Sequence, residues 1–100
     1  MKNRGDIIAS LTFRTTKAGG REGPTAPDEL RCIMTLDGEN FDVKLHLDET
    51  GAVSPGQSVT VPISFLFDYA KPLCAVGKKF TLRELRTIAD GAIDEILFTR

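Results

Sequence analysis

The chain has 100 residues, of which 41% are hydrophobic and 27% are charged, and its formal net charge is −1. These values are typical of one small globular domain, and they argue against a chain that is disordered over most of its length. The small net charge excludes a general electrostatic attraction to nucleic acid or to an anionic membrane, although it leaves a local basic patch open.

No apolar stretch approaches the roughly 20 residues that cross a bilayer, and no apolar segment follows the basic N-terminal pair as a signal peptide requires. We therefore expect a cytoplasmic protein with no membrane contact. Cys32, Cys74 and the single histidine, His46, fit no zinc-binding spacing. We expect two reduced, buried thiols, with a disulfide or a reactive thiol as the alternative, and no metal or cofactor.

The first half of the chain alternates apolar and polar residues. A strand places successive side chains on opposite faces, so residues 7–14 are predicted to form a strand with one buried face. The segment 15–28 is polar and rich in glycine and proline, which predicts a loop long enough to be functional or mobile. Alternation resumes over 30–36 and 41–47, and Asp37-Gly38 between them predicts a tight hairpin turn.

The second half is less regular. After a loop at 48–57, the strand predicted over 59–65 contains Pro62, which cannot donate to a ladder and so indicates an edge position or a bulge. The segment 71–77 begins with a proline and ends with a glycine, as a single helical turn does. A fifth strand begins at Phe80 and is interrupted near 83–86. Asp90-Gly91 predicts a second hairpin turn before the last strand, over 93–98.

Six strands without a useful amphipathic helix predict one all-β domain over residues 1–100, either a barrel or a sandwich. His46 falls on the polar face of its strand, where an exposed surface histidine is expected. The acid pairs at 48–49 and 94–95 have polar neighbours and are expected to form a solvated face rather than an acid–base site.

Several short motifs follow one another in a recognisable order. They are the GGREGP loop at 19–24, the SPGQ turn at 54–57, VTV at 59–61, KP at 71–72, and KFTLRELRT at 79–87. In this order they resemble the C-terminal barrel of translation elongation factor Tu over most of the chain. The resemblance implies a six-stranded antiparallel Greek-key β-barrel. The chain departs from the family at 28–34, which lacks the family's aromatic residues, and at Leu85, which stands where the family has paired glycines.

The chain contains no G-x-x-x-x-G-K-[ST] phosphate loop, so we expect no binding or hydrolysis of GTP and no enzymatic activity of its own. In the family, the positions that match Arg21 and Glu84 lie near the docked T-stem of aminoacyl-tRNA. The resemblance therefore implies an RNA-facing set of Arg21, Arg83, Glu84 and Arg86, whose guanidinium and carboxylate groups suit phosphates and 2′-hydroxyls. Glu22 beside Arg21 and the bulk of Leu85 oppose this interpretation.

Leu66, Phe67 and Tyr69 form a candidate protein-docking patch. Because Phe65 is predicted to face inward, Leu66 should face outward. The alternative is that Leu66 and Phe67 straddle a bulge and are both partly buried. A free-standing copy of the family's barrel would need a protein partner, or association into a homodimer, to cover the surface that packs on other domains in elongation factor Tu.

Our leading interpretation is a non-catalytic interaction module for an unknown protein partner, with contacts through loops 15–28 and 48–57 and the 66–69 region. A translation-related module that binds tRNA or another RNA is the first alternative. An accessory subunit of an enzyme encoded elsewhere is the second.

Overall fold

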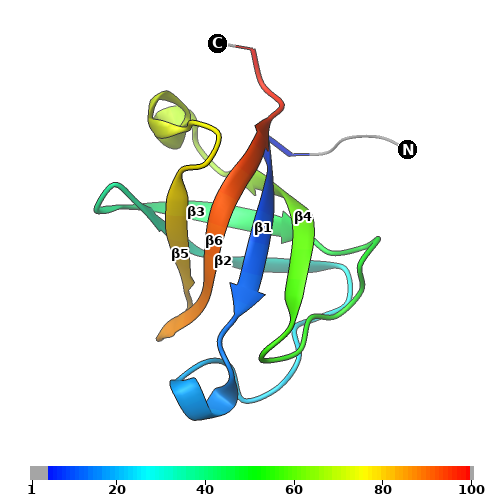
Figure 1. The fold of residues 1–100 in the computed structure, drawn as a ribbon. Helices are drawn as coiled ribbons and strands as arrows, with labels where there is room; N and C mark the ends of the chain where they lie inside the picture. The colour runs from blue at the N-terminus through cyan, green and yellow to red at the C-terminus, as the bar shows by residue number, and fades with distance from the viewer. Residues whose placement is uncertain (1–4, 100) are drawn as a thin grey trace.

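The computed structural model describes residues 5–99, which fold into one closed barrel (Figure 1). Its strands are β1 (Ile7–Phe13), β2 (Glu29–Leu36), β3 (Glu39–His46), β4 (Ser58–Phe65), β5 (Lys79–Arg83) and β6 (Thr87–Ile96). Two short 3-10 helices, η1 (Thr16–Ala18) and η2 (Asp68–Leu73), lie in the connections. Neither helix of this described part is long or apolar enough to cross a membrane.

The strands close in the order β1-β4-β3-β2-β5-β6, and every neighbouring pair is antiparallel. The run β1-β4-β3-β2 is a Greek-key arrangement, because three consecutive strands lie side by side and the remaining one returns beside the last of them. In Figure 1, β6, β1 and β4 stand in front while β2 and β3 cross behind them. The all-β, six-stranded antiparallel barrel expected from the sequence is therefore confirmed.

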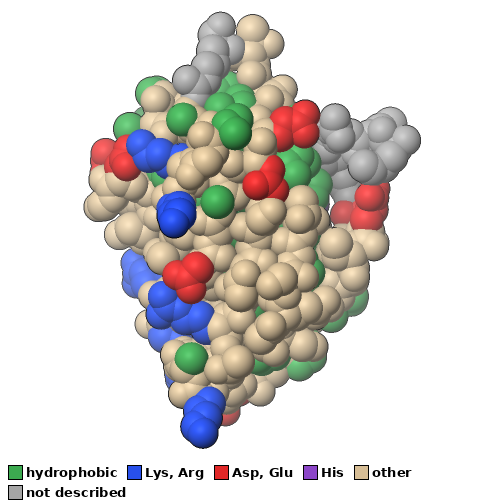
Figure 2. All heavy atoms as spheres, in the orientation of Figure 1, with side chains coloured by type: hydrophobic (Ala, Val, Ile, Leu, Met, Phe, Trp, Pro, Cys, Tyr) green, Lys and Arg blue, Asp and Glu red, His purple; other side chains and the backbone are tan. Residues whose placement is uncertain are grey.

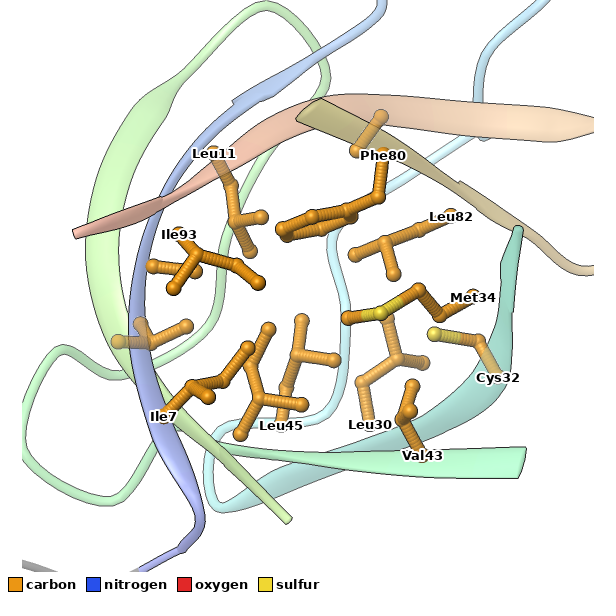
Figure 3. Close-up of a cluster of buried hydrophobic side chains, with 14 of the residues drawn as sticks. Ile7, Leu11, Leu30, Cys32, Met34, Val43, Leu45, Phe80, Leu82 and Ile93 are labelled. Atoms are coloured by element: carbon orange, nitrogen blue, oxygen red, sulfur yellow. The ribbon is translucent and has the colours of Figure 1, made fainter. Parts of the chain in front are cut away.

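The barrel interior is filled by side chains from all six strands. Figure 3 labels several of them, from Ile7 on β1 to Ile93 on β6, and these side chains point toward one another inside the ring. Of the alternating positions predicted to face inward on β1 to β4, all but two are buried, and Phe41 and Val59 are partly buried against the core. Every buried side-chain nitrogen or oxygen of the described residues has a hydrogen-bond partner. The barrel is thus a packed core, with recognition left to its outer surface.

The Asp37-Gly38 hairpin turn is confirmed between β2 and β3. Both residues have positive φ, 52° and 76° respectively, which is the geometry that favours this dipeptide in a two-residue turn. Pro62 is also explained as predicted. It pairs with Ile8 of β1, whereas the ladder from β4 to β3 ends at Ile63, so Pro62 has a strand partner on one side only.

The second predicted turn, at Asp90-Gly91, is wrong, because both residues lie inside β6. Gly91 pairs with Leu11 on one side and with Phe80 on the other. The Asp90 carboxylate accepts two hydrogen bonds from the Arg14 guanidinium, each 3.0 Å long. The chain reverses instead at 84–86, where the Glu84 N–H donates to the carbonyl of Arg86 at 3.0 Å.

The last strand and the helical turn are displaced from their predicted positions. β6 begins at Thr87 rather than at 93, and Leu97 and Phe98 lie beyond its end. The helix η2 covers Asp68–Leu73 instead of 71–77. The buried Ala70 anchors it, and its carbonyl accepts a hydrogen bond from the Cys74 thiol. The sequence predicted a helical turn that begins at the proline, but Pro72 lies near the end of η2.

The two long loops are fastened to each other. Thr25 is buried, and its backbone N–H donates to the carbonyl of Val53 at 2.9 Å, while its hydroxyl accepts from the Val53 N–H at 3.0 Å. The Leu47 N–H donates to the carbonyl of Asp28 at 2.8 Å. Loops 15–28 and 48–57 therefore close one end of the barrel as a joined pair.

Gly91 offers a direct test of this core. A Cβ at this position would lie 2.6 Å from Leu11 Cδ2 and 2.7 Å from the Phe80 ring, and both side chains are buried in the filled interior. We expect Gly91→Ala to lower the free energy of unfolding by about 1–3 kcal/mol through overpacking, measured by urea denaturation. Gly23→Ala is the control, because a Cβ there meets no atom within 4 Å. An equal loss in both variants would contradict the packing.

Candidate functional site

The turn between β5 and β6 is held by an ion pair to the first long loop. Arg21 Nη1 lies 2.6 Å from Glu84 Oε1. The same guanidinium donates from Nε to the carbonyl of Gly23 and from Nη2 to the carbonyl of Pro24, both at 3.2 Å. The two residues that the family resemblance singled out are therefore brought together, and they bind each other.

The local structure before Arg21 fixes the position of its side chain. The Thr15 hydroxyl accepts from the Ala18 N–H at 3.1 Å and so caps η1. Gly19 then takes a left-handed conformation, and the Thr16 hydroxyl donates to the carbonyl of Arg21 at 2.7 Å. The guanidinium is thus used to join the loop to the β5–β6 turn, which leaves it less available to an RNA phosphate.

A groove of about 440 Å³ runs over the outer face of β2 and β3, between Leu66 and the β5–β6 turn. We call it the Leu66–Leu85 groove. Ile33 of β2 is half-buried in its lining and is paired with Asp42 of β3 on one side and with Arg83 of β5 on the other. Residues paired across antiparallel strands share a face, so these three side chains form one row across the groove.

Positive charge exceeds negative charge at one end of this groove. Arg31 and Lys44, which are paired across β2 and β3, both approach Glu29, at 3.2 and 3.8 Å respectively. Arg83 enters the lining from β5 and has no carboxylate within ion-pair distance among the described residues. Arg31 and Lys44 therefore share Glu29, and the lining sets these two cations and Arg83 against Asp42 and Glu84. Within the described residues, the guanidinium of Arg83 is the cation of the groove left to bind an anion.

A second hollow adjoins the groove at Asp42. It is lined by Asn40, Phe41, Asp42, Phe67 and Tyr69, and the Phe67 and Tyr69 rings lie 5.8 Å apart between centroids. We call it the aromatic hollow. The side chains of Leu66, Phe67 and Tyr69 are 57%, 54% and 76% exposed. The outward orientation predicted for Leu66 is confirmed, and the alternative in which a bulge partly buries Leu66 and Phe67 is wrong.

The most exposed large apolar residue of this surface was not predicted as a docking residue. Leu85 is 98% exposed at the tip of the β5–β6 turn, between Glu84 and Arg86. It lines both the Leu66–Leu85 groove and a hollow that contains Arg21 and Arg86. The sequence does contain a signal, because Leu85 is an apolar residue between two charged ones. We missed it because the chain reversal was predicted at Asp90-Gly91 instead of at 84–86.

The face over β6, β1 and β4 is different in character. Figure 2 shows that much of its lower half is uncharged polar surface, and that Lys and Arg side chains gather along its left edge, beside β5 and the β5–β6 turn. On β1 and β4, the outward hydroxyls pair across the strands, with Thr12 and Ser58 at 3.1 Å. Its polar groups hydrogen-bond to one another. Residues on this face are therefore suitable controls for variants of the candidate docking surface.

Cys32 lies beneath the Arg21–Glu84 ion pair. Burial raises the pKa of the Cys32 thiol from an ordinary 9.0 to about 12, and the Glu84 carboxylate adds to the rise while Arg21 opposes it. A thiol with so high a pKa stays protonated at neutral pH and is a poor nucleophile. Cys32 and Cys74 are both buried and free, which confirms the buried thiols expected from the sequence.

His46 is half-buried rather than exposed, because its ring lies against β4. His46 Nε2 and Ser64 Oγ are 2.7 Å apart. The bond joins β3 to β4 just past the end of their ladder at Leu45 and Ile63, which gives it a structural role. Among the described residues, His, Cys, Asp and Glu side chains form no group of three that could hold a metal ion.

The predicted RNA-facing residues are divided between two adjoining depressions. Arg21 and Arg86 line the hollow beside the first long loop, Arg83 lines the Leu66–Leu85 groove, and Glu84 lines both. Arg31, Ile33 and Lys44 were missed, because only the pairing of β2 with β3 and β5 shows that they lie beside Arg83.

A scan against protein-family models gives no match for this chain, and a search of curated proteins gives none either. The geometry of the surface and the residue pattern are therefore the basis on which a function is inferred.

The Arg21–Glu84 ion pair can be tested through stability. We expect Arg21→Ala to cost about 1–2 kcal/mol in urea denaturation, because the guanidinium makes three hydrogen bonds that solvent only partly screens. Arg86→Ala is the matched control and should change stability by less than about 0.5 kcal/mol, since Arg86 is exposed. In a Glu84→Gln background the cost of Arg21→Ala should shrink. Strictly additive costs would contradict the pairing.

Proposed function

We propose that this protein is a non-catalytic interaction module that binds another protein through the Leu66–Leu85 groove and the aromatic hollow. One observation carries the proposal: Leu66, Phe67, Tyr69 and Leu85 are all more than half exposed, and the two depressions that they line meet at Asp42. Large apolar side chains grouped at adjoining depressions mark binding surfaces, and aromatic residues commonly dominate their energetics.

The described part of the chain, residues 5–99, leaves these side chains in solvent. Its interior is already filled, and the 66–69 segment is held outside by the Leu66 N–H, which donates to the carbonyl of Asp42 at 3.0 Å. Burying each such side chain against a partner would contribute about 1.5–3 kcal/mol. A protein partner that covers them together would gain a substantial apolar contact.

The resemblance to the C-terminal barrel of elongation factor Tu supports the same proposal. In that family the barrel packs against other domains, so a barrel of this type has an outer surface suited to docking on a protein. We propose that the module works in the cytoplasm, where a reducing environment keeps thiols such as Cys32 and Cys74 free. An enzyme that uses this chain as an accessory subunit would be one kind of partner.

RNA binding is the second candidate function. It is favoured by Arg83 and Arg86, which flank the β5–β6 turn and form no ion pair within the described residues. It ranks lower because Arg21 is bound to Glu84 and to two carbonyls. RNA binding predicts an affinity for tRNA that falls steeply with rising salt.

The docking surface can be tested by photo-crosslinking in the cells that make the protein. A photoreactive residue placed at Tyr69 should form a specific protein adduct, whereas one at Thr60, on the polar face of β4, should not. Adding Phe67→Ser to the Tyr69 probe should reduce the adduct about tenfold or more, because a buried aromatic contact is lost.

Three outcomes would contradict the proposal of a different protein partner. They are an equal adduct from Thr60, an adduct with RNA, and an adduct between two copies of this chain. The last would replace the partner by a homodimer.

A further inference from the structure

We propose that the Leu66–Leu85 groove binds an extended acidic segment of the partner, in which an apolar side chain lies next to carboxylates. This inference rests on the proposed function and names the chemistry of the partner at that surface.

The shape of the groove suits a short stretch of chain with an apolar side chain. Leu66 borders it at the end of β4, Leu85 borders it at the β5–β6 turn, and the half-buried Ile33 lies between them on β2. Its volume of about 440 Å³ is within the range of sites that hold small ligands or a few side chains. An apolar side chain seated on Ile33 would lie between the two leucines.

The charges select an acidic segment. Arg31 and Lys44 share Glu29 at 3.2 and 3.8 Å, and Arg83 has no carboxylate partner within the described part of the chain. A guanidinium presents N–H donors in a planar fork that matches a carboxylate, so Arg83 is the strongest single anion site of the groove. Ile33 and Arg83 are paired across β2 and β5. A carboxylate next to an apolar side chain seated on Ile33 would therefore lie beside the Arg83 guanidinium.

The same groove is poorly suited to RNA. Its lining contains no aromatic ring on which a base could stack. The lining also contains Asp42 and Glu84, to which the backbone N–H groups of a peptide can donate. A short peptide with a carboxylate aimed at Arg83 therefore fits this mixed charge better than a continuous polyanion does.

The probe for this proposal is a synthetic fluorescent peptide of alternating aspartate and leucine, titrated with the full chain at low salt and followed by anisotropy. Matched peptides of alternating aspartate and serine, and of alternating lysine and leucine, test the two parts of the recognition. We expect saturable binding of the aspartate–leucine peptide only. In a 15N-resolved NMR titration, the shifted amides should be those of β2, β3 and the β5–β6 turn.

Variants then locate the binding. Arg83→Gln should weaken binding about tenfold, as expected for the loss of one charge-assisted hydrogen bond, and Leu85→Ser should also weaken it. Lys79→Gln is the matched control, because Lys79 lies on β5 outside the groove lining and is exposed. Thermal denaturation of each variant establishes that it is folded.

The proposal is overturned if the aspartate–serine peptide binds equally well, if Lys79→Gln causes the same loss as Arg83→Gln, or if a single-stranded RNA displaces the peptide. Failure of this inference is separable from failure of the interaction module. A Tyr69 adduct that persists while the peptide does not bind overturns only the acidic-segment assignment, whereas loss of that adduct overturns the module itself.

Discussion

Three residue pairs join β2 to β5, and both the barrel and its candidate site depend on them. Ile33, Met34 and Thr35 pair with Arg83, Leu82 and Thr81, and this seam is far shorter than the eight-pair ladder between β2 and β3. It closes the ring, so that Met34 and Leu82 meet in the interior. On the outer face it sets Arg83 beside Ile33 and places the β5–β6 turn over β2, which creates the Leu66–Leu85 groove. The same three residue pairs therefore close the barrel and form the groove.

Two arginines near the β5–β6 turn have different roles. Arg21 binds Glu84 and two backbone carbonyls, and so fixes the turn against the first long loop. Glu84 is paired with Arg21, and Arg83 has no carboxylate partner among residues 5–99, so that its guanidinium is available to an incoming anion. The fixed turn also holds Leu85 in solvent at the border of the groove. The candidate site is therefore an anchored turn with an exposed leucine, flanked by Arg83 and Arg86, which form no ion pair with the described residues.

The sequence predicted the elements whose signals are local. Alternation identified β1 to β4 and the outward orientation of Leu66, and Asp37-Gly38 identified the first hairpin. The same dipeptide at Asp90-Gly91 misled, because Gly91 is required there by the close approach of Leu11 and Phe80, which only the tertiary structure shows. The sequence could not place Leu85 or Ile33 in one groove with Leu66, since that juxtaposition depends on the register of the β2–β5 seam.

The most direct test of this account is the cross-strand nuclear Overhauser effects between β2 and β5 in solution, measured together with amide hydrogen exchange. The structure predicts backbone contacts that link Ile33, Met34 and Thr35 to Arg83, Leu82 and Thr81, with slow exchange of the amides that the seam protects. An absence of these contacts, with rapid exchange along β5 on the side that faces β2, would show that the ring is open there and would remove the basis of the groove.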